Sequence, residues 1–94
     1  MKLKITTLIE NNPDDKDQLL NEHGLSLYIE TDGKRILFDT GESGAFIQNA
    51  KTLNKNLEKL DYCVISHGHY DHSGGVEKFI NVINEYPTFI VGEE

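Results

Sequence analysis

The chain has 94 residues, of which 37% are hydrophobic and 27% are charged, and its formal net charge is -7. A chain of this length forms at most one domain with a modest core, and its composition excludes a disordered or fibrous protein. The excess of acidic residues disfavours nucleic acid as a partner, because phosphate attraction needs clustered Lys and Arg.

Three strands are predicted in the first part of the chain, where β-branched and apolar residues alternate. They cover residues 2–10, 25–30 and 35–40. A loop rich in Asn, Pro, Asp and Gly separates the first strand from the second. The Asp32-Gly33 pair between the second and third strands is typical of a tight hairpin turn, so we expect these two strands to be antiparallel.

Helices and strands alternate in the second part of the chain. Apolar residues over 43–60 recur near the helical period, with two asparagines in the middle, which indicates one broken helix or two short ones. A largely apolar strand over 61–66 precedes an amphipathic helix over 76–86 and a last strand over 88–91. This order predicts an α/β architecture of the α+β type, with helices on one face of a mixed sheet and another cover for the second face.

The single Cys63 lies within the apolar strand over 61–66 and cannot form an internal disulfide. In such a strand, a free cysteine is expected to pack in the core rather than to bind a metal. No apolar run has the roughly 18 to 20 residues needed to cross a bilayer, and the start of the chain is too short and too polar for a signal peptide. We therefore expect a cytoplasmic protein without a membrane partner.

Three of the four histidines stand within six consecutive residues, in the stretch HGHYDH of residues 67–72. Neutral imidazole and carboxylate are ligands that Zn²⁺ accepts, and Fe²⁺ and Mn²⁺ accept them too. In an extended segment His67 and His69 project to the same side and can chelate one ion, while a turn after Tyr70 brings Asp71 and His72 towards a second. The pattern predicts a transition-metal site, with Zn²⁺ as the first expectation.

The ligands alone leave the reaction open. Two metal ions roughly 3.5 to 4 Å apart can hold a bridging hydroxide as the nucleophile, which favours hydrolysis. The same ligands suit iron, and an iron site with an open position can bind and reduce oxygen. A catalytic zinc typically takes three protein ligands, so this set is incomplete for two ions.

Two motifs resemble the metallo-β-lactamase fold superfamily: SHGHYDHSGG at 66–75 resembles its signature, and LFDTG at 37–41 resembles the aspartate-bearing turn that precedes it. The segment over 22–44 is most similar to the branch of dihydropterin-ribofuranosylaminobenzene phosphate synthase-like metallohydrolases. The resemblance implies the first half of an αββα sandwich, so residues 1–94 are expected to form a single partial domain. The later histidines and the bridging carboxylate of the family are absent from this sequence.

The resemblance also implies roles for the residues of the cluster. His67 and His69 would bind the first metal ion, and Asp71 and His72 would bind the second. A metal-bridging water would attack the substrate, and Asp71 would help to orient that water. On this interpretation Asp71 is both a ligand and the catalytic residue.

Two residues outside the cluster receive roles from the resemblance. Asp39 would support the metal loop through hydrogen bonds, which keep ligands correctly aimed. The alternative interpretation is that Asp39 is only a turn residue. His23 would face the substrate pocket; its alternative is a solvated loop residue.

Three functions are compatible with the sequence. The first is a metal-dependent hydrolase acting on a small polar or phosphorylated metabolite, with a second segment completing the site. The second is a non-catalytic metal-binding or interaction fragment, which associates through its open sheet face with another copy or with a missing C-terminal half. The third is an oxygen-reducing diiron protein, which would need a flavin partner and which a zinc site would rule out.

Overall fold

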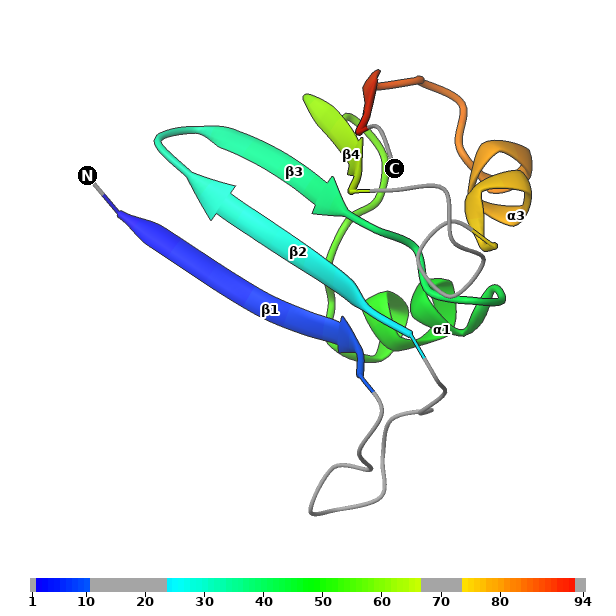
Figure 1. Ribbon diagram of the computed structural model, residues 1–94. Helices are drawn as coiled ribbons and strands as arrows, with labels where there is room; N and C mark the ends of the chain where they lie inside the picture. The colour runs from blue at the N-terminus through cyan, green and yellow to red at the C-terminus, as the bar shows by residue number, and fades with distance from the viewer. Residues whose placement is uncertain (1, 11–23, 67–73, 93–94) are drawn as a thin grey trace.

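A computed structural model of the chain describes residues 2–10, 24–66 and 74–92. Its strands form a five-stranded sheet in the order β1-β2-β3-β4-β5 (Figure 1). The elements are β1 Leu3–Ile9, β2 Ser26–Thr31, β3 Lys34–Phe38, α1 Ala45–Thr52, β4 Tyr62–Ile65, α3 Val76–Val82 and β5 Thr88–Val91. No helix in the described ranges is long and apolar enough to cross a membrane. The predicted mixed fold class is confirmed.

The sheet is antiparallel on one side and parallel on the other. β1, β2 and β3 pair antiparallel, and the β2–β3 turn has positive φ angles at Asp32 (46°) and Gly33 (81°), as this type of hairpin requires. β3, β4 and β5 pair parallel, because α1 and α3 lie in the connections between them. The carboxyl ends of these three strands therefore meet at one edge of the sheet.

Both helices are shorter than the sequence predicts. α1 ends at Thr52 and the chain continues through turns that place Asn54 and Lys59 at positive φ. Of the broken helix or two short helices predicted over 43–60, only the first part is helical. α3 ends at Val82, because the backbone N–H groups of Asn84 and Glu85 donate to the Glu58 carboxylate at 2.9 and 3.1 Å instead of to helix carbonyls.

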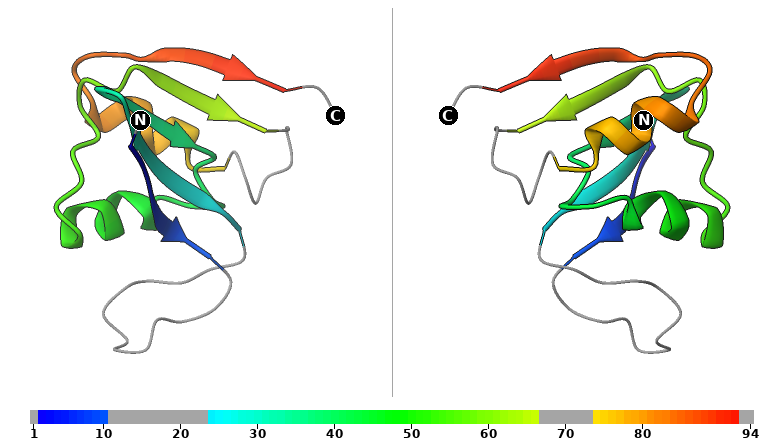
Figure 2. Two further views of the ribbon diagram at one scale, coloured as in Figure 1. Left: turned by 90° about the vertical axis from the view of Figure 1, so that its left-hand side faces the viewer. Right: turned by 90° about the vertical axis from the view of Figure 1, so that its right-hand side faces the viewer.

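The core lies between the sheet and the two helices, which cover the same face (Figure 2). Tyr28, Leu37 and Cys63 are paired neighbours on β2, β3 and β4, and all three are buried. The ring of Phe79 on α3 packs against the ring of Phe46 on α1, with 6.1 Å between the ring centres. One compact apolar core thus joins both helices to the sheet.

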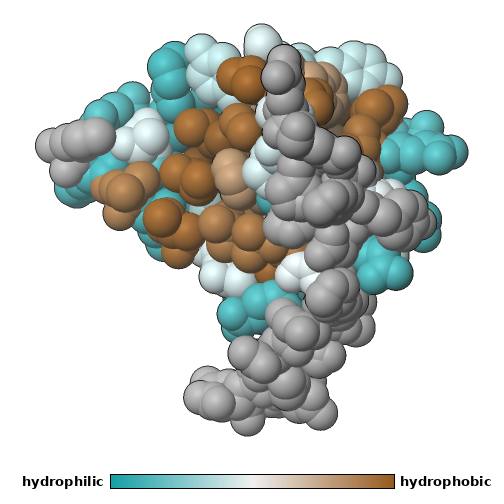
Figure 3. Space-filling model, viewed as in Figure 1, coloured by the Kyte–Doolittle hydropathy of each residue, from teal (hydrophilic) through white to brown (hydrophobic). Residues whose placement is uncertain are grey.

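The other face of the sheet is not covered by any described element. Cross-strand pairing places Ile5, Ile29 and Ile36 in one row on that face. Ile5 is 54% exposed and Ile90 on β5 is 48% exposed. Figure 3 shows apolar side chains gathered over the strands on this side. We call this surface the open face.

Two phenylalanine substitutions compare the loss of stability at a buried position with the loss at a partly exposed one. Phe79 is fully buried, and Phe79→Leu should lower the free energy of unfolding by about 1 to 2 kcal/mol through imperfect packing. Phe89 on β5 is 37% exposed and its ring packs edge-on against Phe79, with 6.3 Å between the ring centres, so the matched variant Phe89→Leu should cost less, about 0.5 to 1 kcal/mol. Urea unfolding followed by circular dichroism measures both, and equal losses would contradict this placement of the core.

Candidate functional site

The five histidine and aspartate residues predicted as ligands or pocket residues lie outside the described residues: His23, His67, His69, Asp71 and His72. Within the described ranges, no group of three or more His, Cys, Asp or Glu side chains is close enough to hold a metal ion. The structure does describe the residues on both sides of 67–73, namely Ser66 directly after β4, and Gly74 and Gly75 directly before α3. It therefore shows how both ends of that segment are held.

The segment 67–73 connects the carboxyl end of β4 to the beginning of α3. In sheets of parallel strands, ligands bind in the crevice outside the carboxyl ends of the strands. The candidate ligands thus belong to a segment that leaves the sheet at the edge where such sites form.

Asp39 holds the first end of the segment. It follows β3 directly, has a positive φ of 59° and is fully buried. Its carboxylate accepts two hydrogen bonds of 2.7 Å from Ser66, one from the backbone N–H and one from the side-chain hydroxyl. Because Ser66 immediately precedes His67, these bonds fix the direction in which the chain enters the segment.

The backbone of Asp39 is fixed as well. Its N–H donates to the carbonyl of Val64 at 2.8 Å, and its own carbonyl accepts a 2.7 Å hydrogen bond from the Ser26 hydroxyl. A buried ionised carboxylate is costly unless it is hydrogen-bonded. Here its two oxygens have partners, so it is a rigid support for the neighbouring strand end.

Gly75 holds the second end of the segment. Its N–H lies 3.1 Å from the Thr40 side-chain oxygen and 3.1 Å from the Gly41 carbonyl, so one donor is shared between two acceptors. A side chain at Gly75 would collide with the carbonyl oxygens of Ser43 and Thr40. The turn after β3 therefore binds both ends of 67–73, Asp39 at one and Thr40 with Gly41 at the other.

The end of β5 approaches the same edge. The Gly92 N–H donates to the carbonyl of Ile65 at 2.8 Å, and a side chain on Gly92 would collide with the carbonyl of Ser66. Only glycine lets β5 come so close to the start of the segment.

Sequence analysis assigned a supporting role to Asp39 but missed Ser66, Thr40 and Gly92. The hydroxyl residues stood inside the two motifs, in SHGH and DTG, and that position was the available signal. Nothing in the sequence near Gly92 pointed to Ser66, because the contact joins two strands that are distant in the chain.

Cys63 belongs to the core and not to the metal cluster. It is fully buried on β4. Burial, and next the negative charge of Asp39, raise the pKa of its thiol to about 12. The thiol is therefore neutral at physiological pH, whereas a metal-binding cysteine is a thiolate.

A family profile, individual relatives and a solved structure all relate this chain to the same superfamily. The sequence profile of the metallo-beta-lactamase superfamily matches residues 21–87. A 7,8-dihydropterin-6-methyl-4-(beta-D-ribofuranosyl)-aminobenzene-5'-phosphate synthase of Methanocaldococcus jannaschii is 39% identical over 93 residues, which are 93% of this chain and 32% of the relative. A UPF0173 metal-dependent hydrolase of Staphylococcus aureus is 38% identical over 60 residues, covering 61% of this chain and 24% of the relative.

A solved structure from the same superfamily is also similar to this chain. The crystal structure of Tm1679, a metal-dependent hydrolase of the beta-lactamase superfamily, superposes with a TM-score of 0.66 at 35% identity, over 80% of this chain and 26% of that one. The present chain spans about a third or less of the length of these relatives.

Replacement of Asp39 by asparagine tests the support of the segment. Asp39→Asn replaces one carboxylate oxygen by an NH2 group and removes the charge that strengthens both bonds to Ser66, so it should lower the free energy of unfolding by about 1 to 3 kcal/mol. Metal retention, measured by elemental analysis, should fall as well. The matched control is Asp32→Asn in the exposed hairpin turn, where φ is also positive and asparagine is accommodated. Equal stability and metal content in the two variants would refute the supporting role.

Proposed function

The chain belongs to the metallo-beta-lactamase superfamily, and we propose that it acts as a metal-dependent hydrolase of that superfamily. One observation carries the proposal: the turn after β3 binds both ends of the segment that contains the three histidines and Asp71. A metal site needs ligands aimed by surrounding hydrogen bonds, and Asp39 and Thr40 supply such bonds at its two flanks. The names of the relatives support the general hydrolase role.

The donor set fits a transition metal. Three imidazoles and a carboxylate within six residues match the preferences of Zn²⁺, and Fe²⁺ and Mn²⁺ are the ions to test against it. We assign His67 and His69 to one ion, and Asp71 and His72 to a second. When bound, the metal supplies a Lewis acid that makes coordinated water more acidic and offsets negative charge on the substrate.

The protein's own residues then have separate tasks. Asp71 would help to orient the attacking water. His23 faces the substrate, while Asp39 acts only as a positioning residue through Ser66. We propose a small polar or phosphorylated metabolite as substrate, because the relative from Methanocaldococcus jannaschii is named for a phosphate-bearing compound.

These four ligands need supplementing, since a catalytic zinc typically takes three from protein. We propose that 1–94 works as a partial domain and that a further polypeptide segment completes the site. The relatives, which are about three times as long or longer, support this proposal. We also propose a cytoplasmic location, where a single unpaired cysteine such as Cys63 stays reduced.

A second candidate function is favoured by the open face. Leu3 and Ile5 on β1 are 61% and 54% exposed, and Ile90 on β5 is 48% exposed. Contiguous apolar surface of this kind marks interaction sites. We propose that, in the non-catalytic alternative, a second copy of the chain covers this face.

His69→Ala in the complete protein tests the hydrolase. The variant should lose bound metal and lose hydrolysis of a chromogenic phosphodiester such as bis(p-nitrophenyl) phosphate, because an alanine cannot replace an imidazole ligand. His23→Ala is the comparison variant: it should keep its metal content but turn over more slowly. Elemental analysis and a steady-state assay measure the two effects, and normal metal content and activity in His69→Ala would refute the assignment.

Sedimentation of the protein over a range of concentrations tests self-association. Ile5→Lys places a charge on the open face. Association would then bury an unpaired ammonium group, which is costly, so the variant should be monomeric. Ile80→Lys places the same charge on an exposed position of α3, 37% exposed, and should leave the association unchanged. A monomer at every concentration would contradict self-association and leave the open face to a different polypeptide.

A further inference from the structure

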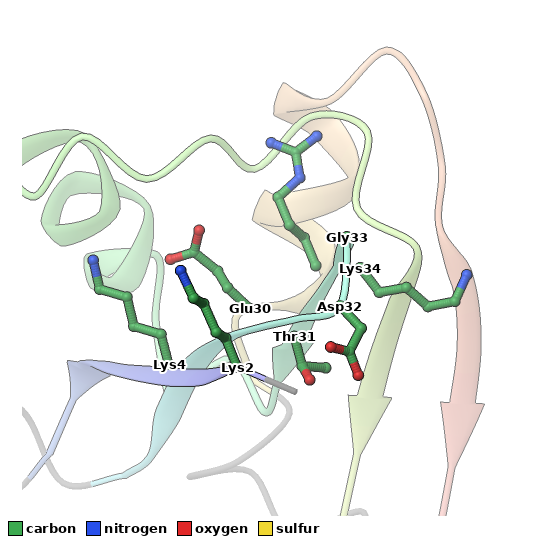
Figure 4. A pocket seen from close by; sticks show the side chains of 8 residues that line it. Lys2, Lys4, Glu30, Thr31, Asp32, Gly33 and Lys34 are labelled. Carbon is green, nitrogen blue, oxygen red and sulfur yellow. The ribbon is translucent and has the colours of Figure 1, made fainter.

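We propose that the end of the sheet opposite the metal segment carries a binding site for a small phosphate-bearing anion, formed by Lys2, Lys4 and Arg35. A cavity of about 570 Å³ opens there, at the start of β1 and around the β2–β3 turn (Figure 4). Its volume lies in the range of small-molecule sites. The proposal does not depend on the hydrolase function.

Strand pairing brings the charged side chains together. Lys4 on β1 pairs with Glu30 on β2, and Glu30 pairs with Arg35 on β3, so the three residues form one row across the sheet. Lys2 stands two residues before Lys4 and therefore projects to the same face. Figure 4 shows Lys2, Lys4 and Glu30 pointing to the same side of their strands.

Positive charge exceeds negative charge in this cavity. Four cationic side chains and two carboxylates line it: Lys2, Lys4, Lys34 and Arg35, with Glu30 and Asp32. Lys55 adds a further cation through its 2.9 Å ion pair with Glu30. An excess of two positive charges, or three with Lys55, thus gathers at one end of a chain whose formal net charge is -7.

The carboxylate of Glu30 is paired with Lys55, which stands outside the row of Lys4, Glu30 and Arg35. The hydrogen bond from Lys55, together with the charges of Lys55, Lys4 and Arg35, holds the pKa of its carboxyl below the ordinary value. Arg35 is fixed by a 3.2 Å hydrogen bond from its guanidinium to the carbonyl of Lys59, which leaves its other N–H groups available. Lys4 and Arg35 thus flank Glu30 in the row of paired residues, and the carboxylate of Glu30 is already paired with Lys55.

A compact anion suits this arrangement better than a polymer. Guanidinium and ammonium groups together are the usual partners of phosphate, through paired hydrogen bonds and point charge. A nucleic acid would extend past the cluster over a chain with 16 acidic and 9 basic residues, where repulsion opposes binding. The volume and the local charge both favour a ligand the size of a phosphorylated metabolite.

The site is separate from the metal segment. β3 begins at Lys34 beside the cavity and ends at Phe38, immediately before Asp39. At about 3.3 Å per residue, Arg35 and Asp39 lie roughly 13 Å apart along this strand. An anion bound in the cavity is therefore a second ligand and not the substrate of the proposed hydrolytic site.

Calorimetric titration with inorganic pyrophosphate tests the site in metal-stripped protein kept in excess chelator, so that binding to metal is excluded. We expect one site per chain, weakening as salt is added. Lys4→Gln should weaken binding about fivefold, by removal of one charge contact. Glu30→Gln should tighten it, because the central negative charge is lost while an acceptor for Lys55 remains.

The matched control is Lys51→Gln, which makes the same change of charge at an exposed position in the last turn of α1. Its affinity for pyrophosphate should equal that of the unmodified protein. Absence of binding, or equal weakening in Lys4→Gln and Lys51→Gln, would overturn the proposal. Circular dichroism of each variant checks that the exposed substitutions leave the fold intact.

Discussion

The pair of hydrogen bonds between the Asp39 carboxylate and Ser66 is the interaction on which the arrangement of this edge depends. A fully buried carboxylate is tolerated only where donors replace the lost water, and Ser66 provides two of them at 2.7 Å. The ends of β3 and β4 are thereby locked together. Because Thr40 and Gly41 follow at once and bind Gly75, the same short turn also fixes the start of α3.

The two faces and the two ends of the sheet differ in chemistry. One face is packed against α1 and α3, while the open face presents a row of isoleucines without a cover among the described residues. One end of the strands leads into the segment with the candidate metal ligands, and the other end carries Lys2, Lys4 and Arg35. A small sheet can therefore separate a proposed reaction site, a contact surface and a proposed anion site.

Most strands and the hairpin could be predicted because their signals are local. The Asp32-Gly33 turn needs only its own two residues at positive φ, and the last strand matched its predicted range, 88–91. The helix ends could not be predicted in this way. α3 stops where Glu58, 26 residues away from Asn84, captures the backbone N–H groups that a longer helix would have used.

The sequence by itself determined the family, the fold class, the sign of the net charge and the cluster of residues 67–72, because each depends on residue type and spacing along the chain. The tertiary structure alone decided that Ser66 and Gly75 are the held ends of that cluster and that Gly92 must lack a side chain. It also decided that Lys4 and Arg35 face one cavity. These contacts join residues that lie far apart in the chain: Asp39 and Ser66 are 27 residues apart, and Thr40 and Gly75 are 35 residues apart. Only the pairing of strands brings them within hydrogen-bonding distance.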